Sequence, residues 1–162
     1  MTLETINVLF VCTGNICRSP TAHGLFEHLV ASQGMQQQIR IDSAGTHGYH
    51  VGEAPDSRAQ ETALLRNIDL SSQRARQISK NDFRDFQYLI AMDEANVEGL
   101  RRFADGQDTQ HVQLFMDFAS RWDEREVPDP YYGGDHGFER VLDMVEDAAE
   151  GLLAHIKRQH FS

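Results

Sequence analysis

Near the start of the chain, a cysteine and an arginine lie six positions apart in the segment CTGNICRS at 12–19. Gly14 and Asn15 tolerate a positive φ, so successive backbone N–H groups can turn inward as an anion-binding nest. Arg18 offers a planar fork that can bind two oxygens of a phosphate. The segment therefore predicts a loop that surrounds a phosphate-sized anion.

Cys12 begins this loop and is expected to point at the phosphorus atom. The loop N–H groups, the guanidinium of Arg18 and the hydroxyl of Ser19 favour the thiolate over the thiol, which gives a nucleophile at neutral pH without a separate base. A buried structural cysteine beside a surface arginine is the simpler alternative. The spacing, the following Ser19 and the Gly-Asn turn together favour the nucleophile.

The elements around the loop must place it between the end of a strand and the start of a helix. Ile6–Val11 is a continuous apolar run, which suits a strand buried on both faces of a parallel sheet. Ser19 and Pro20 predict the helix start, with the Ser19 hydroxyl as the cap. The dipole of this helix would add positive potential at the loop.

Strand and helix then alternate along the rest of the chain. We expect strands at 39–43, 88–92 and 111–118, helices from Asp56 and from Asp93, and a closing helix whose apolar face runs from 138 to 156. Right-handed crossovers between such units give a four-stranded parallel sheet wrapped by helices, a three-layer α/β fold. The length of 162 residues suits a single domain, 1–162.

The charge balance excludes several classes of protein. The chain has 15 Lys and Arg against 25 Asp and Glu, a formal net charge of −10, whereas a sequence-independent nucleic-acid binder needs clustered basic residues. No apolar run approaches the roughly 20 residues that span a bilayer, and the N-terminus lacks the basic lead-in of a signal peptide, so we expect no membrane span and a cytoplasmic protein. Residues 1–81, which include the loop, carry no net charge, and residues 82–162 carry all of it.

Metal and disulfide chemistry are not indicated. Cys12 and Cys17 are the two cysteines of the chain, too few for a disulfide framework and expected to be reduced at rest. The eight histidines are scattered without metal-ligand spacing, so we expect neither a metal site nor a cofactor.

A second segment departs from the regular alternation, the connection DEREVPDPYYGGDHG at 123–137. Connections of this length inside a compact domain are usually functional or mobile. Pro128 and Pro130 restrict the backbone on both sides of Asp129. A carboxyl group held in this way suits proton transfer, while a turn-forming aspartate is the simpler alternative.

Five motifs together resemble the low-molecular-weight protein tyrosine phosphatases over the full chain. They are VCTGNICRSP at 11–20, DSAGT at 42–46, VGEAPDSRA at 51–59, IAMDEAN at 90–96 and DPYY at 129–132. The resemblance implies the phosphotyrosine phosphatase I-like fold, with the phosphate loop at the C-terminal end of the first strand. It also implies metal-independent hydrolysis of phosphotyrosine and aryl phosphates through a phosphocysteine, with phosphotyrosine-containing proteins as substrates.

The resemblance assigns the catalytic roles. Cys12 would be the nucleophile, Arg18 the phosphate clamp, and Asp129 the general acid that later activates water. The remaining loop residues would complete the phosphate site; they are Thr13, Gly14, Asn15, Ile16, Cys17 and Ser19.

Aromatic and supporting roles follow from the same resemblance. Tyr131 and Tyr132 would form walls for a phosphotyrosine ring, and Tyr49 a further wall, although simple packing is the alternative for each. Asn15 and Ser43 would form a hydrogen-bonded pair that holds the phosphate loop in shape.

Cys17 lies within the loop near Cys12, and this nearness suggests a redox role. It would act as a resolving thiol that traps an oxidised Cys12 as a reversible disulfide. A packing cysteine is the alternative.

Two positions depart from the family pattern. His23 stands where relatives commonly have Glu, and Gln73 where they have His. We hypothesise that the two side chains contact each other beneath the phosphate loop, and that the missing carboxylate makes the loop more positive. Two independent surface changes are the alternative.

Two other functions compete with a phosphatase. A thioredoxin-coupled arsenate reductase uses a similar fold and loop but needs further cysteines to relay the disulfide, and this chain has no third one. A catalytically silent phosphate-binding or redox-switch module would show no turnover, although Cys12, Arg18 and Asp129 are all present.

Overall fold

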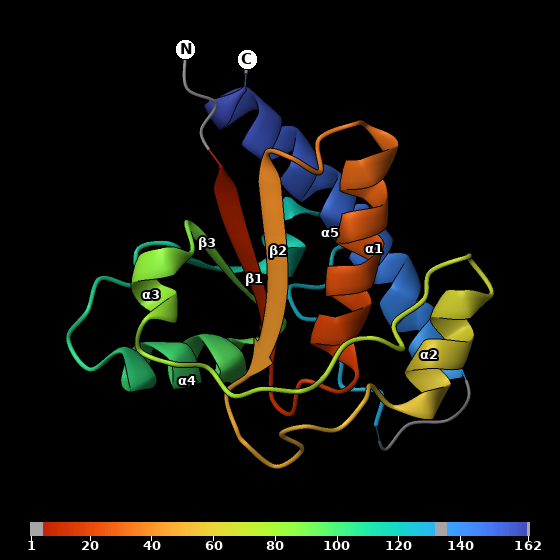
Figure 1. Ribbon diagram of the computed structural model, residues 1–162, viewed down its shortest axis with the longest axis horizontal. Helices are drawn as coiled ribbons and strands as arrows, with labels where there is room; N and C mark the ends of the chain where they lie inside the picture. Colours follow the sequence, from red (N-terminus) through yellow and green to blue (C-terminus); the bar gives the residue numbers. More distant parts are fainter. Residues whose placement is uncertain (1–4, 132–135, 162) are drawn as a thin grey trace.

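The computed structural model describes residues 5–131 and 136–161, and four parallel strands form the centre of this part (Figure 1). The strands are β1 (Ile6–Cys12), β2 (Ile39–Gly45), β3 (Tyr88–Ala91) and β4 (Val112–Leu114), in the order β2-β1-β3-β4. The helices are α1 (Arg18–Ser32), α2 (Ser57–Leu64), α3 (Asp82–Asp85), α4 (Glu94–Ala104) and α5 (His136–His160), with a 3-10 turn, η1 (Phe115–Phe118), after β4. The predicted four-stranded parallel α/β fold is confirmed.

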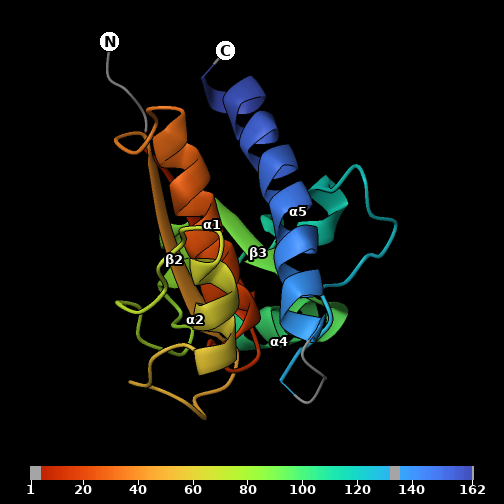
Figure 2. The same ribbon diagram turned by 90° about the vertical axis from the view of Figure 1, so that its right-hand side faces the viewer.

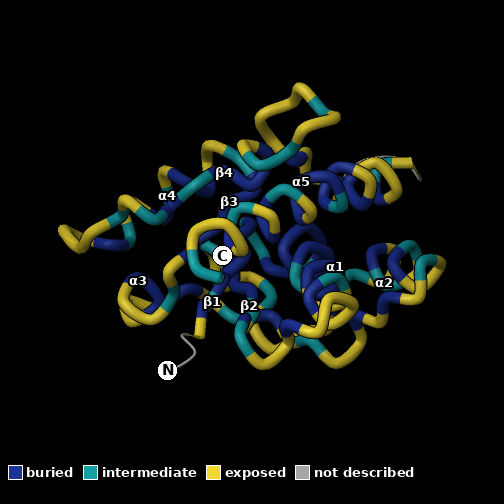
Figure 3. Tube along the Cα trace, turned by 90° about the horizontal axis from the view of Figure 1, so that it is seen from above, coloured by how far each residue is buried: buried dark blue, intermediate teal, exposed yellow. Residues whose placement is uncertain are grey.

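Helices cover both faces of the sheet and make three layers (Figure 2, Figure 3). On one face, α1 and α5 pack side by side, and α2 packs against them. The other face is covered by α3 and α4. Because successive side chains of a strand point to opposite faces, Val8 and Phe10 of β1 join the α1 and α5 core, whereas Leu9 and Val11 join the α4 core.

Because the strands are parallel, their carboxyl ends all lie at the same edge of the sheet. The connection from β1 to α1 and the start of α4 after β3 both lie there (Figure 1). The long connection before α5 reaches the same edge, where the N–H of Val127 donates to the carbonyl of Met92 at 2.8 Å. The start of α4 and the long connection, which are distant in sequence, therefore meet beside the phosphate loop.

Two helix starts agree with the sequence analysis and one does not. Asp56 and Asp93 are the N-caps of α2 and α4, and each carboxylate accepts a hydrogen bond from a backbone N–H of the first turn. By contrast, α1 begins at Arg18 with Cys17 at the N-cap and without a side-chain cap. The prediction that Ser19 caps this helix is wrong, because its hydroxyl lies 3.0 Å from the sulfur of Cys12 and accepts a hydrogen bond from Asn15.

The predicted strand at 111–118 is only partly correct. Pairing with β3 covers Val112–Leu114, because β3 ends at Ala91, which pairs with Leu114. The chain then turns as η1 and buries Phe115, whose ring lies 5.1 Å from that of Phe10. The alternating apolar residues at 111–118 therefore belong partly to the strand and partly to this turn.

One buried carboxylate of α5 fastens residues 120–122, directly before the long connection. Asp147 is 1% exposed and accepts hydrogen bonds from the backbone N–H groups of Ser120, Arg121 and Trp122 at 2.8–3.1 Å. Burial by itself raises the pKa of Asp147, but these backbone hydrogen bonds lower it below the ordinary value. The carboxylate therefore stays ionised and ties the connection to the core.

We expect Asp147→Ala to lower the free energy of unfolding by about 2 kcal/mol at neutral pH, because three N–H groups lose a charged acceptor. Since the folded pKa is lowered, the stabilisation exists above the unfolded pKa and disappears as the pH falls below about 4. Urea unfolding across this pH range measures the difference. Arg121→Ala, which leaves the carboxylate in place, is the control, and a difference between Asp147→Ala and wild type that does not shrink in acid would contradict the assignment.

Candidate active site

The phosphate loop joins β1 to α1 and takes its shape from Asn15. This residue has a φ of 60° and is 2% exposed. Its side-chain amide donates to the hydroxyls of Ser19 at 2.8 Å and Ser43 at 3.0 Å, and its carbonyl oxygen accepts from the N–H of Arg76 at 3.0 Å. Both the NH₂ group and the oxygen of the side-chain amide are thus hydrogen-bonded. These bonds support a left-handed backbone conformation that non-glycine residues rarely adopt.

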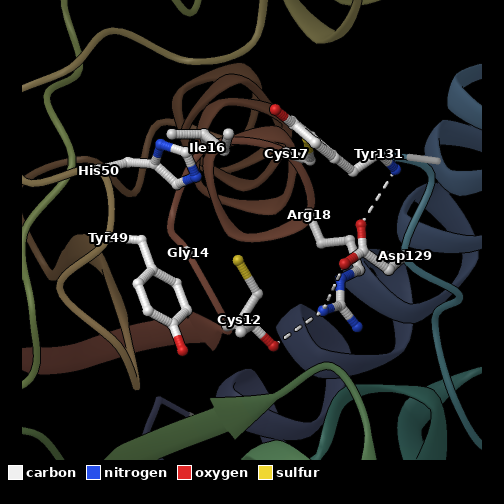
Figure 4. Close-up of a pocket in the computed structure, with 10 residues that line it drawn as sticks. Cys12, Gly14, Ile16, Cys17, Arg18, Tyr49, His50, Asp129 and Tyr131 are labelled. Carbon is white, nitrogen blue, oxygen red and sulfur yellow. Dashed lines mark hydrogen bonds and ion pairs between the residues drawn. The ribbon is translucent and has the colours of Figure 1, made fainter.

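The sulfur of Cys12 lies at the base of a cavity that opens at this loop (Figure 4). Cys12 is 3% exposed, and its Sγ lies 3.0 Å from Oγ of Ser19. Because Asn15 already donates to that oxygen, the hydroxyl hydrogen of Ser19 can point at the sulfur. The arrangement suits a negatively charged sulfur.

Arg18 is a buried cation at the first residue of α1. Its Nη1 donates to Oδ2 of Asp93 at 2.6 Å and to the carbonyl of Val127 at 3.1 Å, and its Nη2 donates to Oγ1 of Thr13 at 3.3 Å. Burial by itself lowers the pKa of Arg18, but the charges of Cys12 and Asp93 raise it above the ordinary value. The guanidinium therefore remains charged although it is 2% exposed.

Asp93 has a second function that the sequence analysis did not anticipate. Its Oδ1 caps α4 by accepting the N–H of Asn96 at 2.8 Å, while its Oδ2 binds Arg18. The sequence signal for the cap was correct, but the contact with Arg18 joins residues 75 positions apart. The position of Asp93 directly after a strand, at the edge where the loop also lies, is the signal that could have indicated it.

Asp129 lies across the cavity from the phosphate loop, with its side chain 47% exposed (Figure 4). Oδ2 is 3.7 Å from Nη2 of Arg18. Oδ1 accepts the N–H of Tyr131 at 3.0 Å, so the carboxyl group is held by its own turn. The long connection therefore brings a carboxyl group to the mouth of the loop.

The cavity has a volume of about 170 Å³, and its lining joins most of the predicted residues. They are Cys12, Thr13, Gly14, Ile16, Cys17, Arg18, Tyr49, His50, Asp129 and Tyr131. Asn15, Ser19 and Ser43 lie behind the lining, where they support the loop. Tyr132 lies outside the described residues.

Aromatic rings form the rim. The rings of His50 and Tyr131 are 6.4 Å apart, and Tyr49, which is 72% exposed, stacks on His47. His50 was not predicted, although its position beside Tyr49 could have indicated it. A Cβ at Gly14 would lie 3.0 Å from the His50 ring, so a larger residue there would require this ring to shift.

Cys17 differs from Cys12 in its electrostatic environment. It is 5% exposed, and burial, followed by the negative charges of Asp56 and Cys12, raises the pKa of its thiol far above the ordinary value. Its sulfur is therefore protonated at neutral pH and does not compete as a nucleophile.

The two departures from the family pattern meet at Ser43. Nδ1 of His23 lies 3.3 Å from the Ser43 hydroxyl, and the hydroxyl lies 3.5 Å from Oε1 of Gln73. The two side chains therefore share Ser43 as a neighbour, and a direct contact between them remains a hypothesis. His23 also pairs with Glu27 at 3.2 Å, so a carboxylate is still present near this position.

Among the residues that the structure describes, no group of three His, Cys, Asp or Glu side chains is placed to hold a metal ion. Within the same residues, no helix is both long and apolar enough to cross a membrane.

Comparisons with known proteins agree with this geometry. Residues 7–161 match the family model of the low molecular weight phosphotyrosine protein phosphatases. The chain is 42% identical over 154 residues to the low molecular weight protein-tyrosine-phosphatase YfkJ of Bacillus subtilis, covering 95% of this chain and 97% of the relative. It is 41% identical over 152 residues to the human low molecular weight phosphotyrosine protein phosphatase, covering 92% and 94%.

A solved structure supports the same assignment. The crystal structure of a protein tyrosine phosphatase from Entamoeba histolytica, with Hepes in its active site, aligns with a TM-score of 0.92 at 37% identity. The alignment covers 96% of this chain and 99% of that one. The resemblance seen in the motifs is thereby confirmed, and the chain belongs to the low molecular weight phosphotyrosine protein phosphatase family.

Proposed function

We propose that this protein hydrolyses phosphotyrosine in proteins, and small aryl phosphates, through a phosphocysteine and without a metal ion. The observation that carries the proposal is the cavity in which Cys12, Arg18 and Asp129 converge. Family membership supports the reaction class, and the geometry supports a role for each residue.

In the first step, the Cys12 thiolate attacks phosphorus as the phosphorus–oxygen bond to the phenol breaks. Asp129, in its protonated form, donates a proton to the departing oxygen. Arg18 and the inward N–H groups of the loop stabilise the oxygens of the five-coordinate transition state. The products of this step are the phenol and a phosphocysteine.

In the second step, water attacks the phosphocysteine and releases phosphate. The Asp129 carboxylate, left by the first step, accepts a proton from that water. The sulfur departs as a thiolate, which the Ser19 hydroxyl at 3.0 Å stabilises by a hydrogen bond. Cys12 is therefore the nucleophile in the first step and the leaving group in the second, while Asp129 first donates a proton and then accepts one.

The depth and rim of the cavity favour an aryl phosphate. Cys12 is 3% exposed at the base, so a phosphate must be carried inward on a long side chain. The rings of Tyr131, His50 and Tyr49 line the cavity and can pack against a phenyl ring. We expect phosphoserine to be too short to place its phosphate at the base while its backbone stays outside the rim.

A resolving role of Cys17 remains a prediction. Condensation of its thiol with a Cys12 sulfenic acid would form a disulfide and release water. The raised pKa of Cys17 slows this step, because the thiolate is the attacking form.

Both cysteines are free thiols in the structure, and a cytoplasmic location, which we also propose, would keep the nucleophile reduced.

With p-nitrophenyl phosphate in EDTA, we expect full activity of the wild type and none of Cys12→Ser, because a hydroxyl in this site is a far weaker nucleophile. With phenyl phosphate, whose departing oxygen needs a proton, Asp129→Ala should lower kcat/KM by about 100-fold or more through loss of the general acid. Steady-state absorbance measures both. Turnover by Cys12→Ser, or dependence on added metal, would sink the mechanism.

A panel of phosphopeptides with one sequence and phosphorylated Tyr, Ser or Thr tests the substrate class. We expect kcat/KM for phosphotyrosine to exceed the other two by about 100-fold or more, because misplacing the reacting group by 1 Å already costs that much. Released phosphate is the readout. Comparable values for the three peptides would exclude selection by cavity depth.

Charge beside the phosphotyrosine should also affect the rate. A second cavity of about 650 Å³ next to the first is lined by five acidic side chains, among them Glu124, Glu126 and Asp129, and by the two arginines Arg125 and Arg140. Residues 82–162 carry the whole negative charge. We expect basic flanking residues to raise kcat/KM at low salt, and added salt to weaken the preference. Equal values for acidic and basic phosphopeptides at low salt would refute this prediction.

A further inference from the structure

Arg58 lies on α2, outside the cavity, yet its side chain contacts the connection that carries Asp129. Nη2 donates to the carbonyl of Tyr131 at 3.2 Å. The guanidinium also lies 5.5 Å from the centre of the Tyr131 ring and 4.7 Å from that of Phe138, in the first turn of α5. One side chain of α2 therefore holds Tyr131 by its backbone and its ring.

Asp56 holds the guanidinium itself in place. Its Oδ1 accepts Nε of Arg58 at 3.1 Å, and its Oδ2 accepts Nη2 at 2.9 Å, a two-point contact that fixes the plane of the fork. Burial by itself raises the pKa of Asp56, but the hydrogen bonds from Arg58 lower it below the ordinary value. The pair is ionised at neutral pH.

The pair is also attached to the phosphate loop. The backbone N–H of Asp56 donates to the carbonyl of Ile16 at 2.8 Å. At the other end, the N–H of Tyr131 donates to Oδ1 of Asp129. A continuous series of contacts therefore runs from the phosphate loop through Asp56, Arg58 and Tyr131 to the carboxyl group of Asp129.

On the N-terminal side of Asp129, the connection is fastened by Val127, which bonds to Met92 and to Arg18. Arg58 contacts the connection on the C-terminal side, at Tyr131. Asp129 itself is exposed and is 3.7 Å from Arg18, too long for a hydrogen bond that would fix its position. Within the described residues, its own turn to the N–H of Tyr131 and these flanking attachments contribute to its placement.

We propose that Arg58 is a positioning residue that holds the Asp129 carboxyl group at the distance from Cys12 that proton donation needs. The inference rests on the proposed function, because it concerns the general acid of that reaction. It also assigns a role to the VGEAPDSRA motif at 51–59, which supplies Asp56 and Arg58.

The test compares leaving groups in Arg58→Met, which keeps the aliphatic stem and removes the hydrogen bonds. Phenyl phosphate needs a proton on its departing oxygen, whereas p-nitrophenolate leaves readily without one. We expect kcat/KM to fall about 10-fold or more for phenyl phosphate, because small displacements of a catalytic group are costly, and much less for p-nitrophenyl phosphate. Arg58→Lys should recover part of the loss.

The matched control is Arg66→Met. Arg66 follows α2 and also reaches α5, where it bonds to Asp143 and Glu146, but it does not contact the connection at 119–131. We expect wild-type kcat/KM on both substrates. Thermal unfolding of all variants identifies any that fail to fold, and Arg58→Lys replaces Arg58→Met if that variant does.

Combination with Asp129→Ala separates positioning from general damage. If Arg58 acts through Asp129, then Arg58→Met has no further effect in the Asp129→Ala background. Equal losses on both substrates, or the same loss with and without Asp129, would overturn the inference. If Asp129→Ala itself shows no selective loss on phenyl phosphate, the proposed general acid fails first, which is a distinct result.

Discussion

The guanidinium of Arg18 is buried where three distant segments meet, and the arrangement of the site depends on it. It binds the carboxylate of Asp93 after β3, the carbonyl of Val127 in the long connection, and the hydroxyl of Thr13 in the phosphate loop. A buried charge without such partners would cost several kcal/mol. The contacts that make this charge tolerable are therefore the contacts that assemble the catalytic edge, and the same charge is available to a phosphate.

Around Arg18, hydrogen bonds within the protein hold the phosphate loop in shape. Asn15 keeps its positive φ through bonds to Ser19 and Ser43, and Ser43 in turn meets His23 and Gln73. A network with its hydrogen bonds met stays rigid, so the loop N–H groups need not reorganise in the transition state. His23 and Gln73 fall in this supporting layer, away from the reacting atoms.

Much of the fold and the centre of the site could be predicted from short-range patterns. The apolar run at Ile6–Val11 indicated a strand buried on both faces, and Asp56 and Asp93 indicated two helix starts. The cap assigned to Ser19 failed, because a hydroxyl that can cap a helix can equally bind a nearby sulfur or amide. The predicted end of the last strand was wrong because an alternating pattern does not reveal how many residues of the neighbouring strand are available for pairing.

The sequence by itself determined the chemistry of the loop, because the nucleophile, the clamp and the turn residues lie within a few positions and depend on local backbone geometry. Only the tertiary structure decided which carboxylate holds Arg18, that His50 joins Tyr49 and Tyr131 at the rim, and how Asp129 is held. Those contacts join residues such as Arg18 and Asp93, or Arg58 and Tyr131, that are more than seventy positions apart. They exist because a parallel sheet in the order β2-β1-β3-β4 gathers the ends of its strands at one edge.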